Sequence, residues 1–109
     1  MLIAMGCATA PAPAEQIAVS NAAMARAEMA GAPELAPVEM RVAREKLARL
    51  DAAMAAKDYR HALWLAQETQ ADAELAEVRA RSAKATRAAA AAVKQGTQAV
   101  PDQPAHKTR

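Results

Sequence analysis

Few side chains of this sequence have a type and a spacing that suit acid–base, nucleophilic or metal chemistry. The two histidines are His61 and His106, and because Leu65 stands four residues after His61, no helical pair of metal ligands forms. Ser20 and Ser82 have no base near them in the sequence, and the three glycines lie too far apart for a phosphate-binding loop. The sequence therefore predicts no catalytic residue, no metal site and no cofactor.

The acidic residues do not form a catalytic pair either. Asp72 and Glu74 point about 200° apart on a helix, so their carboxylates cannot act on the same substrate. Glu68 and Asp72 do share a helix face, which we interpret as a solvated edge of the fold. We therefore expect a protein that is not an enzyme and that takes no small-molecule substrate.

Cys7 is the residue whose surroundings indicate a covalent modification. It follows the short apolar run Met1–Gly6, which ends in a small residue, and this order is typical of the end of a bacterial lipoprotein signal, where the cysteine is acylated. Alternating Pro and Ala then favour an extended tether of roughly 20 Å. We interpret 1–7 as the remnant of a lipoprotein signal and 8–15 as the tether. The alternative is a disordered N-terminus with a chance cysteine.

Composition limits the fold to one small helical domain. The chain has 109 residues, and alanine accounts for 34 of its 58 hydrophobic residues. With no Phe, one Trp and one Tyr, it lacks the aromatic and β-branched residues of a β-sandwich. The net charge of +2 is too small to indicate a nucleic-acid partner, and one cysteine excludes an intramolecular disulfide.

Helix-forming residues dominate from residue 16 onward, and the breaks between them predict three helices, at 16–30, 37–56 and 59–95. The first break starts at Gly31, and Pro37 suits the first turn of the second helix. Asp58 is expected to cap the third helix. We expect the helical domain to span 16–95, with Gly96 ending the ordered part and 96–109 forming a disordered tail.

Apolar spacing predicts an all-α fold in which the second and third helices form an antiparallel hairpin. The second helix carries a seam with steps of three and four residues, at Met40, Ala43, Leu47, Leu50 and Met54. The third carries a stripe of small residues, at Ala62, Ala66, Thr69, Ala73, Ala76, Ala80 and Ala83. Tyr59 and Trp64 are expected to close the hairpin against Leu50 and Met54. The first helix has a vaguer stripe, at Ile17, Met24 and Met29.

The third helix is much longer than the second, so its part beyond Glu77 should project. Charge changes sign near that point, from −4 over residues 58–78 to +5 over residues 79–95. An apolar stripe also runs opposite the small one, at Trp64, Ala71, Leu75, Val78, Ala85, Ala89 and Val93. It is expected to pack on the first helix or on a partner outside the chain, and part of it is expected to serve association. The predicted partner-binding residues on the two features are Trp64, Leu75, Val78, Arg79, Arg81, Lys84 and Arg87.

Several blocks of the sequence resemble a known family. They are Ala32–Met40, Ala43–Leu47, Ala53–Tyr59, the pairs Ala62-Leu63 and Leu65-Ala66, and Ala71–Ala76. Their order is similar to that of the bacterial envelope family filed as domain of unknown function 4398. The resemblance implies a small lipoprotein of a Gram-negative envelope, in some members joined to an OmpA-like peptidoglycan-binding domain. It carries over no catalytic residue.

Two hypotheses from different functional classes follow. In the first, the protein is a non-catalytic lipoprotein that is acylated at Cys7 and held on the inner leaflet of the outer membrane, facing the periplasm. Ala8 after the cysteine fits that sorting. Its helical module would bind or space another envelope component, or pair with a second copy. In the second, the protein is a soluble helical adaptor that self-associates without a lipid anchor.

Overall fold

The computed structural model describes residues 11–99, with side chains over 11–96, and within this range the chain is all-α with no strand. It contains four helices: α1 (Ala14–Met29), α2 (Ala32–Leu35), α3 (Pro37–Ala55) and α4 (Tyr59–Ala99). Cys7, the signal remnant and the part of the predicted tail beyond residue 99 lie outside the described residues. The three predicted helices are confirmed, and α2 is an addition.

The first predicted break contains the additional helix. α1 ends at Met29, and Gly31 adopts φ +86°, a left-handed conformation that glycine takes without a Cβ penalty. The single turn α2 follows at once, with Pro33 in its first turn, and Pro37 then starts α3 as predicted. A four-residue helix leaves no periodic pattern in a sequence, so the break reads only as a turn.

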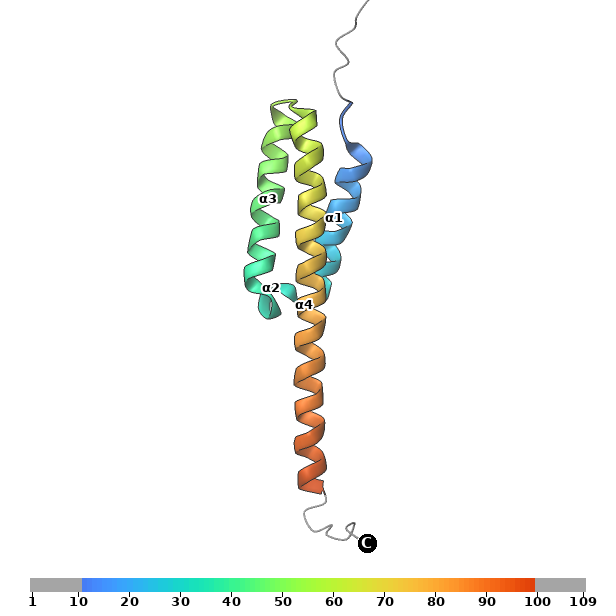
Figure 1. Ribbon diagram of the computed structural model, residues 1–109, viewed down its shortest axis with the longest axis vertical. Helices are drawn as coiled ribbons and strands as arrows, with labels where there is room; N and C mark the ends of the chain where they lie inside the picture. Colours follow the sequence, from blue (N-terminus) through green and yellow to red (C-terminus); the bar gives the residue numbers. More distant parts are fainter. Residues whose placement is uncertain (1–10, 100–109) are drawn as a thin grey trace, which may run out of the picture.

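The hairpin between α3 and α4 has the predicted turn chemistry. Lys57 adopts φ 58° after the end of α3, and α4 starts two residues later. The Asp58 carboxylate accepts a hydrogen bond from the backbone N–H of His61 at 3.4 Å, as an N-cap residue does. These two residues reverse the chain so that α3 and α4 run antiparallel (Figure 1).

α4 is the central helix, with α3 along one side and α1 along another (Figure 1). We call the small residues on its packed side the inner stripe: Ala62, Ala66, Thr69, Ala73, Ala76 and Ala80, all fully buried. Ala73, Ala76 and Ala80 of this stripe pack with residues of α1, α2 and α3. Ala62 and Ala66 pack with Leu50 and Ala53 of α3. The predicted seam of α3 and stripe of α4 are confirmed.

Two packing details differ from the sequence-based expectation. Leu65, which is buried, packs with Leu50 at the closed end of the hairpin, whereas Trp64 is exposed. On α1 the buried residues are Ser20, Ala23, Met24 and Ala27, whereas Met29 is 84% exposed. Both corrections have the same cause. Small residues fill most of the contact between the helices, and larger side chains are buried only where they point into it, as Leu65 and Met24 do, whereas Trp64 and Met29 point away from it.

Gly96 does not end the third long helix. α4 continues through it to Ala99, so the predicted end at residue 95 is wrong by four residues. One glycine in a helix costs only about 1 kcal/mol relative to alanine, and the alanine run before it favours propagation. We call residues 82–99 the arm, since α4 extends there well past the ends of α1 and α3 (Figure 1).

Candidate interaction surface

The predicted apolar stripe opposite the inner stripe is exposed. We call Trp64, Ala71, Leu75 and Val78 the outer face of α4. Trp64 is 53% exposed, Leu75 44% and Val78 63%. The indole of Trp64 stacks on the His61 ring with centroids 5.9 Å apart, which orients it on the surface. The structure thus places three predicted partner-binding residues together on one side of one helix.

Helix geometry explains why this side is free. At 100° per residue, the α4 residues that pair with α1 (Glu74 and Glu77) and those that pair with α3 (Glu68, Asp72 and Arg79) are centred roughly 170° apart, and the outer face lies between them on the side away from the inner stripe. Among the described residues, α1, α3 and the short α2 pack on α4, and the outer face remains about half exposed.

A cluster of ion pairs joins α3 to α4 at one edge of the bundle. Lys46 Nζ lies 2.7 Å from Asp72 Oδ2 and 3.3 Å from Glu68 Oε1. Contact with Asp72 raises the pKa of Lys46 above its ordinary value of 10.5, desolvation opposes this effect, and Glu68 adds to it. Glu68 and Asp72 are thus partly buried and form an inter-helix contact with Lys46, where the sequence indicates a solvated edge. The sequence shows no signal for this pairing, because Lys46 lies far from both acids along the chain.

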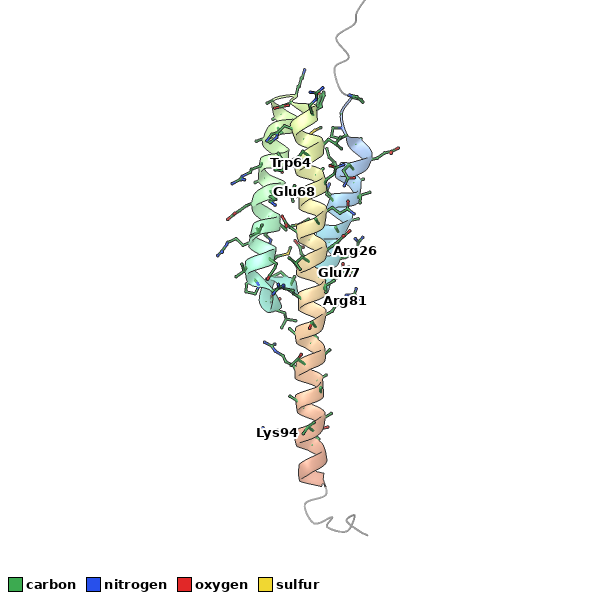
Figure 2. All side chains as sticks on the ribbon, in the orientation of Figure 1. Arg26, Trp64, Glu68, Glu77, Arg81 and Lys94 are labelled. Carbon is green, nitrogen blue, oxygen red and sulfur yellow. The ribbon has the colours of Figure 1, made fainter. Side chains whose placement is uncertain are left out.

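The predicted basic residues do not form one site. Arg79 Nε pairs with Glu39 Oε1 on α3 at 3.1 Å. Arg81 pairs with Glu77 at 2.7 Å on the side of α1, where Arg26 also contacts Glu77 at 3.4 Å (Figure 2). Of the four predicted cations, Arg79 therefore joins α4 to α3, whereas Arg81 pairs within α4 on the opposite edge, and the outer face lies between them.

Two hollows flank the outer face. One, of about 360 Å³, is lined by Arg26, Met29, Ala30, Arg81 and Lys84 beside the end of α1. The other, of about 540 Å³, runs between the start of α3 and α4 and includes Leu75, Val78, Arg79 and Ser82. The second hollow continues the outer face toward the arm, so the apolar surface does not stop where α1 and α3 end.

The arm itself is exposed at every described position from 84 to 96. Arg87 and Lys94 lie on it with no ion-pair partner among the described residues, and Figure 2 shows Lys94 far from the other helices. The seven predicted residues therefore fall into an outer face, two packed edges and the arm. What the arrangement offers is a surface for another helix.

Metal-ligand clusters and membrane-spanning helices are two further features that the described part of the chain does not contain. Residues 11–99 contain no group of three or more possible metal ligands. None of the helices in this range is both long and apolar enough to cross a bilayer.

The fold is thus a small all-α module with an extended central helix and an open apolar face. Its family is defined by sequence: the family model described as Domain of unknown function (DUF4398) matches residues 15–92, and the chain belongs to that family. The match covers α1 to α3 and most of α4. Neither a curated protein nor a solved structure shows significant similarity to the chain.

Proposed function

We propose that the protein is a non-catalytic cell-envelope lipoprotein whose helical module binds or spaces another envelope component. The observation that carries the proposal is the uncovered surface of α4. Trp64, Leu75 and Val78 form an apolar face without a neighbouring helix, and this face leads onto a bare arm. Apolar residues gathered on one face of a helix indicate an association surface.

The proposed anchor is a lipid on Cys7, supported by the apolar run before it and by the Pro/Ala segment after it. α1 starts at the same end of the molecule as the turn between α3 and α4, and the arm points the opposite way (Figure 1). α4 has 41 residues and is about 60 Å long. A chain anchored before α1 would therefore present the arm at a distance from the outer membrane, as a spacer does.

The anchor is tested by expressing the gene from its own locus and comparing wild type with Cys7→Ala and Cys7→Ser. We expect wild type to fractionate with membranes and to incorporate labelled palmitate. Both variants should be soluble and unlabelled, because acylation needs the thiol and serine cannot replace it. Ala8→Ser, beside the cysteine, is the matched control and should remain labelled. Identical fractionation of wild type and Cys7→Ala would contradict the anchor.

The alternative is a soluble adaptor that self-associates through α4. The same exposed face supports it, but it predicts a wild type that is unlabelled and soluble. The DNA upstream of Met1 separates the two further. An in-frame basic and apolar extension favours the lipoprotein, and a stop codon favours the adaptor.

A further inference from the structure

We propose that the outer face of α4 binds the arm of a second copy of this chain, running antiparallel, so that two α4 helices pair symmetrically about residue 80. The inference deepens the proposed function by naming the partner of the outer face. The antiparallel pair does not depend on acylation of Cys7. The pair can therefore be wrong while the lipid anchor is right, and the lipid anchor can be wrong while the pair is right.

The two surfaces match in length and direction. The outer face runs from Trp64 to Val78, and the stretch of the arm from Ser82 to Gly96 has the same 15 residues, or about 22 Å. In the arm, Ser82, Ala85, Ala89, Val93 and Gly96 continue the outer face within an arc of roughly 80°. An antiparallel pair places each arm against the outer face of the other copy.

Side-chain size is complementary in this register. Positions whose numbers add up to 160 face one another, and three of these pairs join a large or medium residue of the outer face to a small residue of the arm. They are Trp64 with Gly96, Leu75 with Ala85, and Val78 with Ser82. In the same register Ala71 faces Ala89, which joins two small residues, and Val93 of the arm faces Gln67. A large side chain opposite a small one lets two helices approach closely, as the inner stripe does within one chain.

Gly96 is informative because it has no role within the single chain. A Cβ at this position would meet nothing within 4 Å, and its φ is not in the left-handed region, so neither packing nor the backbone requires glycine there. In the antiparallel pair it faces the stacked indole of Trp64, the largest side chain of the outer face. A residue without a side chain leaves room for that ring.

The net charges of the bundle and the arm favour the antiparallel direction. Residues 11–78 contain seven Lys and Arg against eleven Asp and Glu, a net charge of −4 that internal ion pairs do not change. Residues 79–96 contain five Lys and Arg and no acid, a net charge of +5. Antiparallel pairing lays each basic arm beside the acidic bundle of the other copy, whereas parallel pairing opposes like charges. The attraction acts over a distance, because at 100° per residue Lys84, Arg87 and Lys94 lie roughly 130–150° from the outer face and do not meet the partner directly.

The contact is two-fold symmetric, so the arm-to-face contact occurs twice. From residue 64 to residue 96 it is about 48 Å long, and a strip about 10 Å wide buries roughly 1,000 Å² in total. This is the low end for a specific interface, so we expect a dimer that dissociates on dilution and weakens in high salt.

The first experiment is sedimentation of the full chain carrying Cys7→Ala, over a range of concentrations. We expect a monomer–dimer equilibrium. Leu75→Glu and Gly96→Leu should each weaken it at least about tenfold, while Ala48→Glu, on the exposed side of α3, should leave it unchanged. Because Gly96→Leu raises helix propensity and meets nothing in the single chain, its loss of dimer would not reflect unfolding.

The second experiment tests the register by oxidative cross-linking in the same Cys7→Ala background. Ala71→Cys and Ala89→Cys variants should cross-link when mixed and should not cross-link singly, because position 71 lies about 27 Å from its own copy in the antiparallel pair. Cross-linking of Ala71→Cys alone would indicate parallel pairing and overturn the proposal. A wild type that is monomeric at every concentration would overturn it as well.

Discussion

The two sides of α4 show burial in the opposite order to side-chain size. The inner stripe consists of alanines and one threonine and is fully buried, whereas the outer face has Trp64, Leu75 and Val78 and is about half exposed. Small residues let α1 and α3 approach α4 closely, and the larger side chains in that contact are Met24 of α1, Met40 and Leu50 of α3, and Leu65 of α4. Burial on α4 therefore follows from which side its neighbouring helices pack on, and three larger apolar side chains of the other side stay about half exposed.

The largest effect expected from this comparison is that of truncating the same residue type on the two sides. Leu50 is fully buried, so Leu50→Ala should lower the free energy of unfolding by about 2–5 kcal/mol through lost burial and a cavity. Leu75→Ala, on the outer face, should lower it by less than about 1 kcal/mol in the monomer. Chemical denaturation of dilute samples measures both, and equal losses would mean that the outer face is core.

Enlarging an alanine on each side should give the next largest effect. Ala73 is fully buried between the helices, so Ala73→Leu should destabilise the monomer by about 1–3 kcal/mol through overpacking. Ala71→Leu lies on the exposed outer face and should be nearly neutral, since leucine is also a good helix former. Thermal unfolding of the two variants beside wild type decides the point. Similar small shifts at both positions would contradict the inner contact.

The smallest effect concerns the ion pairs of Lys46, which join α3 to α4 at the edge between the inner stripe and the outer face. Since the folded state raises the pKa of Lys46 above its ordinary value of 10.5, the stabilisation it provides is present below that pH and is lost as pH rises through the folded value. We expect wild type to exceed Lys46→Met in stability by about 0.5–1 kcal/mol at pH 8. The difference should shrink toward pH 11. A difference independent of pH would show that Lys46 acts by packing alone.

Local signals in the sequence were sufficient for most of the fold. The seam from Met40 to Met54, the cap at Asp58 and the start at Pro37 all depend on neighbours within one or two turns, and all three are confirmed. The signals failed where the outcome depends on a competing preference. A single glycine at position 96 does not stop a helix that alanine propagates, and four residues at 32–35 are too few to show a period.

The candidate surface could be predicted in part. The spacing of Trp64, Leu75 and Val78 placed them on one side of a helix, and the structure confirms that this side is exposed. The roles of Arg79, Arg81 and Lys84 could not be told apart from the sequence. Arg81 pairs with Glu77, which is close along the chain, but Arg79 pairs with Glu39 and Lys84 lies beside Gly31, and these partners are far away in the sequence.

By itself, the sequence determined that the chain is helical, that the third long helix exceeds its partner and that two apolar stripes run along it. Each of these properties follows from composition and from periodicity along a single segment. Only the tertiary structure decided that α1 and α3 both pack on the stripe of small residues and that the larger stripe remains open. That choice depends on how closely three helix axes can approach, and no single helix contains the information.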